Sequence, residues 1–279
     1  MQPFERVLAV DWSGALQGAE RHIWLAEYTG NGLVRLEAGR SREQLAQHLI
    51  ECNFRGPRSL IGLDFAFGFP HWFARSHGAA DGTQMWELAR EQGERWLKEC
   101  PPPFWGRPGR PRPPEPPSRP AWRRTETEGP AVRGIRPKSV FQVGGAGSVG
   151  TGSLRGMPLL AQLREAGLEI WPFAPPQAPL PPQQACVVTE IYPRLFTGKV
   201  HKSNRAQRAL HLANHWPELD GAFREAAEVS EDAFDAACSA RGLYAAREQF
   251  PPPGWPDGDW ERIEGRIFTP RTEPFHTRP

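Results

Sequence analysis

The first third of the chain contains apolar and alternating runs that predict three strands. Residues 6–10 (RVLAV) are apolar after the arginine and stop at Asp11, and residues 21–28 (RHIWLAEY) alternate. The Gly-Asn-Gly turn at residues 30–32 leads into a third run over residues 33–36. We expect these runs to form an antiparallel meander.

A helix and a second apolar strand follow the meander. Ser41 and Gln44 have the spacing of a capping box, and apolar residues recur on one helical face to about residue 53. Residues 58–64 (RSLIGLD) are apolar throughout their second half, which is typical of a central strand, and they end in Asp64 before a glycine-containing turn. Two predicted strands therefore end on an aspartate.

Regular alternation lapses after residue 70. Residues 83–100 predict a helix, but the ten prolines between residues 101 and 120 exclude a helix or a central strand there. We expect residues 70–137 to be a Pro/Arg-rich insertion into a single domain that spans residues 1–279.

Much of this insertion belongs to a basic segment, residues 104–138, which holds nine basic and three acidic residues. Its net charge is +6, whereas the whole chain carries only +2. Such a segment, with Arg123 and Arg124 in it, suits either contact with a phosphate backbone or a solvated loop. Tryptophans within or just before it suit either stacking on unpaired bases or anchoring of the insertion; they are Trp86, Trp96, Trp105 and Trp122.

The second half of the chain predicts further helices and strands. A short ordered stretch at residues 139–143 precedes the glycine-rich run GGAGSVGTG, and a proline-rich link lies at residues 175–182. Residues 185–191 predict an apolar strand that carries Glu190. The other expected elements are helices at residues 157–166, 202–213 and 217–227, a short strand at residues 168–173, and a last helix with Ser230 as its N-cap.

Composition narrows the class of protein. The four cysteines lie far apart without paired spacing, so neither a zinc site nor a disulfide framework is indicated, and we expect reduced, buried thiols. Neither a basic leader followed by an apolar run nor eighteen consecutive apolar residues occur in the sequence. We therefore expect a soluble, cytoplasmic protein that does not contact membranes.

Five acidic residues form the candidate catalytic set. Asp11, Asp64 and Glu190 lie at strand ends, and Asp232 and Asp235 are three residues apart on one helix. That spacing places two like charges on one helical face, which is unfavourable without a cation. Magnesium and manganese take carboxylate oxygens, and two such ions can clamp the oxygens of a phosphodiester.

Each acidic residue also has a simpler interpretation. Asp11 and Asp64 can cap their own turns, and Asp232 can interact with the helix dipole. Glu190 can pair with Arg194 or Lys199. The interpretation of all five acids as one metal-binding site is favoured, because the order of elements is expected to bring the ends of the first, fourth and fifth strands and the last helix together.

Five stretches of the chain carry a family resemblance: AVDWSG, IGLDFAFGFP, VVTEIYPRLF, SEDAFDAACSA and EGRIFTP. In this order they resemble a family of uncharacterised proteins described as predicted RNase H-like nucleases, in the superfamily that includes the RuvC resolvases. The resemblance covers nearly the whole chain apart from the Pro/Arg-rich insertion. DAFDAA is its most specific motif, because RuvC-like enzymes carry Asp-x-x-Asp there.

The resemblance implies an α/β fold of the RNase H-like kind, a five-stranded mixed sheet with helices on both faces. It also implies Mg²⁺ or Mn²⁺, with Asp11 bridging two metals, Asp64 and Asp235 each holding one, and Asp232 supporting the second. Glu190 is then a further ligand or a group behind the ligands. RuvC-like nucleases more often carry a glutamate where this chain has Asp64.

The glycine-rich run suggests a place for substrate. It satisfies G-x-G-x-x-G at Gly145, Gly147 and Gly150, with Glu169 at the distance of a ribose contact, but a proline soon after it argues against a dinucleotide site. We expect a nest of backbone amides that holds a substrate phosphate; a flexible surface loop is the alternative. The residues expected to assist are Lys138, Ser148 and Thr151.

These observations predict a Mg²⁺- or Mn²⁺-dependent nuclease that acts on a nucleic acid. RuvC-type enzymes act as dimers, so the resemblance is compatible with a homodimer. Two alternatives stay open at this point. One is an ATP-dependent phosphotransferase of the actin-like kind, which uses paired glycine-rich phosphate loops. The other is a non-catalytic module that binds a phosphorylated ligand or a nucleic acid.

Overall fold

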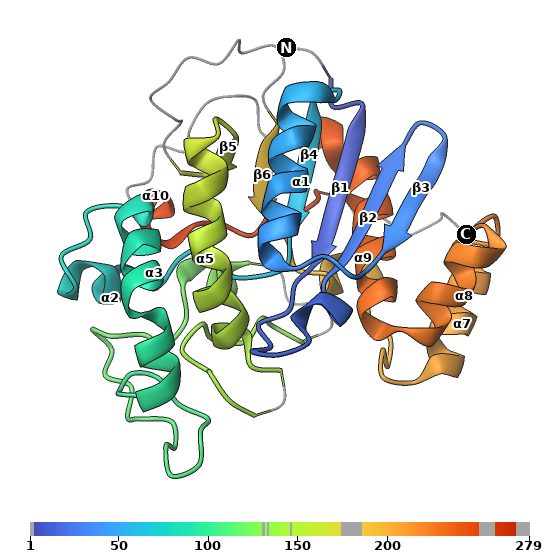
Figure 1. Ribbon diagram of the computed structural model, residues 1–279. Helices are drawn as coiled ribbons and strands as arrows, with labels where there is room; N and C mark the ends of the chain where they lie inside the picture. The colour runs from blue at the N-terminus through green and yellow to red at the C-terminus, as the bar shows by residue number, and fades with distance from the viewer. Residues whose placement is uncertain are drawn as a thin grey trace.

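Six strands form one mixed sheet in the order β3-β2-β1-β4-β6-β5, shown in Figure 1. The computed structural model describes residues 3–129, 132, 134–145, 147–173, 186–250 and 260–271, so the link predicted at residues 175–182 lies outside the described residues. The strands are β1 (Arg6–Asp11), β2 (Trp24–Thr29), β3 (Gly32–Glu37), β4 (Ser59–Leu63), β5 (Glu169–Trp171) and β6 (Val187–Glu190).

The predicted meander is confirmed, because β1, β2 and β3 pair antiparallel in sequence. The next strands, β4, β6 and β5, run parallel to β1. The expected count of five strands is wrong by one. The short strand predicted over residues 168–173 joins the sheet edge as β5, where it pairs with β6.

Side chains of β1 alternate between two cores, one on each face of the sheet. Leu8 and Val10 pack into the larger core, and Val7 and Ala9 pack into the smaller one. All four are fully buried, which is why the strand reads as a continuous apolar run. The sheet is therefore covered on both faces.

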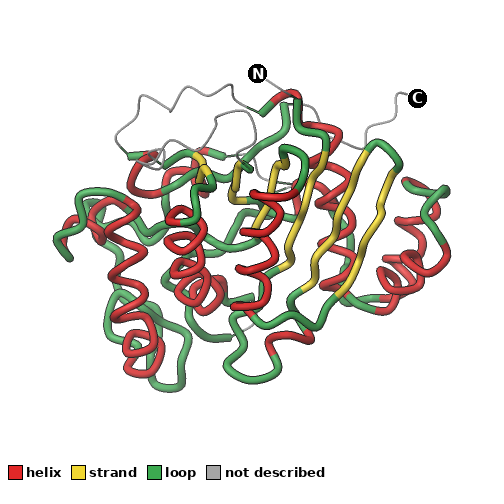
Figure 2. Tube along the Cα trace, turned by 45° about the horizontal axis from the view of Figure 1, so that its top comes forward, coloured by secondary structure: helices red, strands yellow, loops and turns green. Residues whose placement is uncertain are grey.

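Helices supply the two covers (Figures 1 and 2). The larger core lies under α1 (Arg42–Arg55), α3 (Gly82–Glu99) and α5 (Val149–Glu165), and the smaller one under α9 (Glu231–Ala246). Beyond β3, α7 (Arg205–His215) and α8 (Gly221–Val229) pack with α9 in a third small cluster. The short helices are α2 (His71–Ser76), α4 (Arg124–Glu128), α6 (Arg194–Thr197) and α10 (Glu261–Glu264), and the 3₁₀ turns are η1 (Ala19–Arg21) and η2 (Arg247–Gln249).

Two of the predicted helix starts are confirmed in atomic detail. The hydroxyl of Ser41 accepts from the amide of Gln44 (3.2 Å), and the Gln44 side chain accepts from the amide of Ser41 (2.9 Å). The hydroxyl of Ser230 accepts from the amide of Ala233 (3.1 Å) at the start of α9. The small residues on α9 allow it to lie close against β1 and β2.

The start of α5 differs from the prediction. The helix begins at Val149, eight residues before the expected start at residue 157, and it includes Pro158 in its interior. Gly150 makes the early start possible, because a Cβ at this position would lie 2.1 Å from the carbonyl oxygen of Val140. The glycine-rich run therefore belongs partly to a helix.

Residues 139–143 do not form a sheet strand. Their one described bridge joins Gln142 to Trp105 in the basic segment. The amide of Trp105 donates to the carbonyl of Phe141 (3.0 Å), and the amide of Val143 donates to the carbonyl of Trp105 (2.9 Å). The basic segment is thus tied to the stretch that leads into α5.

Residues 70–137 share the larger core with the sheet. Aromatic rings from this region and from residue 141 pack together: Phe73 and Phe104 contact Phe141 at centroid distances of 5.0 and 5.5 Å, and Trp96 contacts Phe73 and Phe104 at 5.5 and 5.6 Å. Trp86 and Trp96 are buried in the same core, which favours the anchoring role for these two tryptophans. The region therefore contributes to the packing of the domain.

The four cysteines are free and buried, as expected. Over the described parts of the chain, the helices are too short or too polar to cross a bilayer.

Candidate functional site

The two aspartates at the ends of predicted strands are neighbours in the structure. Asp11 ends β1 and Asp64 directly follows β4, and these parallel strands pair with Val10 opposite Leu63. The amide of Asp64 donates to the carbonyl of Val10 (3.1 Å), so the pairing continues one residue beyond β4. Because side chains alternate along a strand, Asp11 and Asp64 share the sheet face opposite to that of Leu63.

Glu190, the third acid at a strand end, belongs to the other face. It ends β6 in register with Leu63, so its side chain follows that of Leu63. There it is buried, and Arg123 binds both of its oxygens (Nη2 to Oε1 2.5 Å, Nη1 to Oε2 2.8 Å). The amide of Phe67 donates to Oε2 (2.9 Å). The carboxylate is already satisfied, so we do not assign Glu190 as a metal ligand.

Asp235 completes an acidic cluster on the face of Asp11. It projects from α9, which packs against β1 and β2, and its side chain is buried. The ammonium group of Lys202 donates to its Oδ2 and lies 3.9 Å from the carboxylate of Glu231. The other oxygen of Asp235, Oδ1, is buried and has no hydrogen-bond partner among the residues that the structure describes.

Burial and neighbouring negative charges raise the pKa of the three carboxylates. Burial raises the pKa of Asp11 well above its ordinary value of 3.8, and the charges of Asp235 and Asp64 raise it further. Burial raises the pKa of Asp64 to about 7, with Asp235 adding to the effect. Burial also raises the pKa of Asp235 to about 6, against the lowering effect of Lys202. The pKa of Lys202 is raised because these three carboxylates outweigh its burial.

Asp232 lies at the edge of this cluster. It is in the first turn of α9, and its Oδ2 lies 3.0 Å from Nδ1 of His22. Its side chain is 32% exposed, and its charge also raises the pKa of Asp11. Asp232 therefore affects the cluster through its negative charge, while its carboxylate is oriented toward His22 by the hydrogen bond.

A cavity of about 660 Å³ opens beside Asp64. The glycine-rich loop forms much of its wall, and two arginines, Arg107 and Arg155, line it. Arg155 is held by Glu94 (Nε to Oε1 2.7 Å) and donates to the carbonyl of Gly14. Arg107 is exposed and forms no side-chain hydrogen bond or ion pair with any described residue. A volume of this size accommodates a small molecule or a segment of a polymer.

The glycine-rich loop is placed as the sequence suggests, with one exception. Gly145 and Gly147 have positive φ angles (80° and 68°) and line the cavity together with Ser148 and Thr151. Thr151 uses its hydroxyl to donate to the carbonyl of Val143 (2.9 Å). Gly150 is the exception, because it is buried in backbone packing and serves the fold.

The three basic residues predicted to contact substrate lie at three separate places in the structure. Lys138 is exposed beside Gly147, at whose position a Cβ would lie 3.8 Å from the Lys138 Cε. Arg123 is fully buried between Glu190 and Glu126, so it cannot reach a substrate. The guanidinium of Arg124 lies 5.6 Å from the ring of Trp260 and lines a separate surface hollow. Of the three, Lys138 is the one near the cavity beside Asp64.

The donor set of the acidic cluster fits a divalent cation, but its arrangement is not that of a formed metal site. Within the described ranges, no three His, Cys, Asp or Glu side chains are grouped closely enough to hold one ion. The oxygens themselves are available. Asp11 and Asp64 accept no side-chain hydrogen bond from described residues, and Oδ1 of Asp235 has no partner. Carboxylate oxygens without donors are the ligands that Mg²⁺ and Mn²⁺ take.

Three residues of the site are missing from the sequence-based prediction. Lys202 is the first residue of the helix predicted over residues 202–213, but it lies in the loop before α7, and no local pattern indicates that its ammonium reaches α9. Arg107 and Arg155 are part of basic stretches, but only the tertiary structure places them at the same cavity.

None of the family models, curated proteins and solved structures compared with the chain matches it.

Proposed function

We propose that the protein is a nuclease that uses Mg²⁺ or Mn²⁺ to hydrolyse phosphodiester bonds of a nucleic acid. The observation that carries the proposal is the meeting of Asp11, Asp64 and Asp235, which come from two parallel strands and a helix distant in sequence. Carboxylates whose pKa is raised by burial and by nearby negative charges are costly to the fold, and such groups cluster at functional sites. A divalent cation would relieve this cost.

We infer that the fold is of the RNase H-like kind. The antiparallel meander, the parallel strands that follow it and the acidic helix α9 against β1 support this inference. They bring together the strand ends and the last helix that the sequence motifs mark.

In this proposal the residues of the chain have distinct roles. Asp11, Asp64 and Asp235 provide oxygen ligands, and Lys202 balances their charge while no cation is bound. Asp232 adds negative charge nearby. When bound, the divalent cation stabilises the extra negative charge of the transition state and lowers the pKa of an attacking water.

The cavity beside Asp64 supports a place for the substrate phosphate. Arg107 and Arg155 carry positive charge, and the first backbone amides of α5 have no side-chain cap at Ser148. Arg155 is oriented by Glu94, so Arg107 is the more adaptable of the two arginines. We assign phosphate binding to Arg107 and to the start of α5.

Cleavage assays test the proposed function. Labelled single-stranded, duplex and junction forms of DNA and RNA are incubated with the protein and Mn²⁺, Mg²⁺ or EDTA. We expect cleavage of at least one substrate with the metals and none with EDTA. Asp11→Asn, Asp64→Asn and Asp235→Asn are expected to lose at least about 100-fold in rate, because each removes a ligand oxygen charge. Glu91→Gln, which changes an exposed carboxylate on α3, is the matched control.

One observation favours a second function, a module that binds a nucleic acid without cleaving it. The Lys202 ammonium already pairs with Asp235, which gives the cluster a cation of its own. In that case, binding falls with salt and does not depend on metal, and no substrate of the panel is cleaved.

A further inference from the structure

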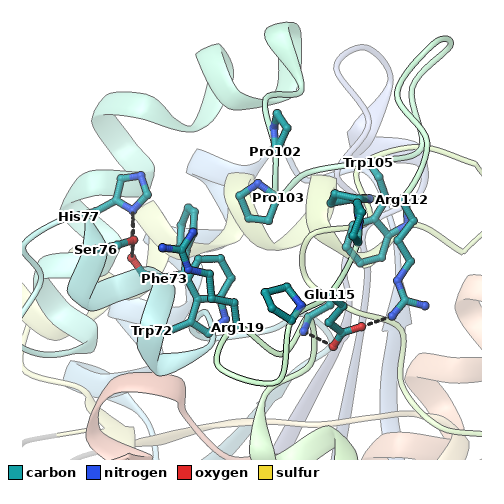
Figure 3. A pocket seen from close by; sticks show the side chains of 14 residues that line it. Trp72, Phe73, Ser76, His77, Pro102, Pro103, Trp105, Arg112, Glu115 and Arg119 are labelled. Atoms are coloured by element: carbon teal, nitrogen blue, oxygen red, sulfur yellow. Dashed lines mark hydrogen bonds and ion pairs between the residues drawn. The ribbon is translucent and has the colours of Figure 1, made fainter.

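A second cavity, of about 420 Å³, lies between α2 and the basic segment (Figure 3). None of its lining residues belongs to the acidic cluster. Its walls are mainly apolar. Trp72 and Phe73 of α2 face Trp105 of the basic segment, with Pro102 and Pro103 between them. Three further prolines are among the other lining residues: Pro113, Pro114 and Pro116. Flat rings on several sides of the cavity suit a planar ligand.

The edge of this cavity is positively charged. The guanidinium of Arg119 lies 5.6 Å from the centre of the Trp72 ring, and this residue forms no ion pair within the described part of the chain. Arg112 lies 5.6 Å from the Trp105 ring and is paired with Glu115. The hollow therefore combines apolar walls with one uncompensated cation, in a segment of net charge +6.

The two cavities are joined by three consecutive residues. Trp105 lines the second cavity, and Arg107 lines the cavity beside Asp64. Residues two apart in an extended chain are separated by at most about 7 Å. Gly106, which lies between them, packs against the glycine-rich loop so closely that a Cβ would be 2.4 Å from the carbonyl oxygen of Gly144. The positions of the two cavities are thus fixed relative to one another.

We propose that the second cavity binds an unpaired nucleobase of the strand whose phosphate lies beside Asp64. The proposal rests on the proposed function, because it assigns part of the same substrate. The aromatic and proline rings stack on the base, and Arg119 interacts with its phosphate. An apolar peptide side chain would leave the charge of Arg119 and the rest of the basic segment unused, whereas a nucleotide uses both features of the cavity.

Binding of oligonucleotides in EDTA tests the proposal without any cleavage. The probe is a fluorescein-labelled single-stranded oligothymidylate of about 10 nucleotides, within the site size of single-strand grooves. Its partner probe has the same phosphates but abasic sugars. We expect the wild-type protein to bind the thymidylate at least about ten-fold more tightly, measured by fluorescence anisotropy, because only this probe offers bases for stacking.

Two variants locate the base. Arg119→Ala removes the exposed cation, and Ser76→Trp fills the cavity from an exposed position at the end of α2. Ser76→Trp is expected to bind the two probes with equal affinity, whereas Arg119→Ala is expected to bind both probes more weakly, because both carry the phosphate that Arg119 contacts. Arg55→Ala is the matched control, because it removes an exposed positive charge at the end of α1 and is expected to keep the preference for bases.

The outcomes separate this proposal from the nuclease itself. Equal affinity of the wild-type protein for both probes, or no binding of either, overturns the base site even if cleavage with Mn²⁺ is observed. A preference for bases that survives in Ser76→Trp, or unchanged affinity of Arg119→Ala for both probes, also overturns it. A preference for bases that is lost in Ser76→Trp supports the base site even if no substrate is cleaved, in which case only the nuclease is contradicted.

Discussion

Lys202 forms an ion pair with one oxygen of Asp235, while the other oxygen, Oδ1, is buried without a described hydrogen-bond partner. The ammonium is the one cation that contacts this carboxylate among the described residues, and it also attracts Asp64 and Asp11. Lys202 therefore contacts a cluster of three carboxylates, with the charge of Arg194 acting on Asp235 as well. In the proposed function, a divalent cation would relieve this excess of negative charge.

Replacing the lysine should expose this imbalance. Lys202→Met leaves Asp235 buried and unpaired, so we expect a loss of about 3 kcal/mol in the free energy of unfolding at pH 8, measured with urea. The loss is expected to shrink as the pH falls toward 6, because Asp235 takes up a proton more readily without Lys202 than in the wild-type protein, where its pKa is about 6.

Manganese should restore stability to this variant more than to the wild-type protein, because the ion then supplies the missing charge. Lys199→Met, at an exposed lysine three residues earlier, is the control and should unfold like the wild-type protein. Equal stability of the two variants at pH 8 would contradict the role of Lys202.

The raised pKa values predict how stability depends on pH. Between about pH 4 and pH 7, Asp64 holds a proton in the folded protein and has lost it in the unfolded chain, because folding raises its pKa from 3.8 to about 7. The unfolded state therefore binds fewer protons, and this group makes stability fall as pH rises through that window.

Asp64→Asn removes the effect. We expect the variant to be more stable than the wild-type protein above pH 7, by on the order of 2 kcal/mol, since one unit of pKa difference is worth about 1.4 kcal/mol. The two proteins should converge near pH 4. The measurement is urea unfolding across this pH range, with Glu91→Gln as control. A stability difference that is the same at all pH values would contradict the raised pKa of Asp64.

Arg123 is predicted to stabilise the fold and not to act in substrate binding. Arg123→Met leaves the buried carboxylates of Glu190 and Glu126 without their counter-charge, so we expect a loss of about 3–5 kcal/mol in urea unfolding. Arg124→Met, at the next residue, lacks such partners and should change stability by less than about 1 kcal/mol. Similar stability of both variants would show that the buried pair is unimportant.

The close contact between two glycines should hold the basic segment to the glycine-rich loop. In Gly144→Ala, the new Cβ would lie 2.3 Å from the carbonyl oxygen of Gly106, so the segment must move. We expect faster hydrogen–deuterium exchange at the amides of Trp105 and Val143, whose hydrogen bonds join the basic segment to the stretch before the glycine-rich loop. Gly221→Ala, where a Cβ meets no atom within 4 Å, is the control. Unchanged exchange of these amides in the first variant would disprove the contact.

The sequence indicates the acidic strand ends, but it does not reveal the sheet face of each. Asp11, Asp64 and Glu190 look alike as acids after apolar runs. The pairing of Leu63 with Val10 and with Glu190 separates them, because a shift of one residue in register moves a side chain to the other face. Register depends on tertiary pairing, so the role of Glu190 could not be predicted locally.

Charge partners distant in sequence are hidden for the same reason. Arg123 and Glu190 are 67 residues apart, and Lys202 and Asp235 are 33 residues apart. By contrast, the caps at Ser41 and Ser230 were predictable, because each depends on residues within three positions.

Binding of Mn²⁺ by the acidic cluster is the most direct test of the proposed site. The electron paramagnetic resonance signal of free Mn²⁺ is followed during titration of the wild-type protein and of the Asp11→Asn/Asp64→Asn double variant. We predict saturable uptake by the wild-type protein and none by the variant, which keeps its fold because two repelling charges are removed. Absence of uptake by the wild-type protein, or equal uptake by both, would contradict the proposed metal site.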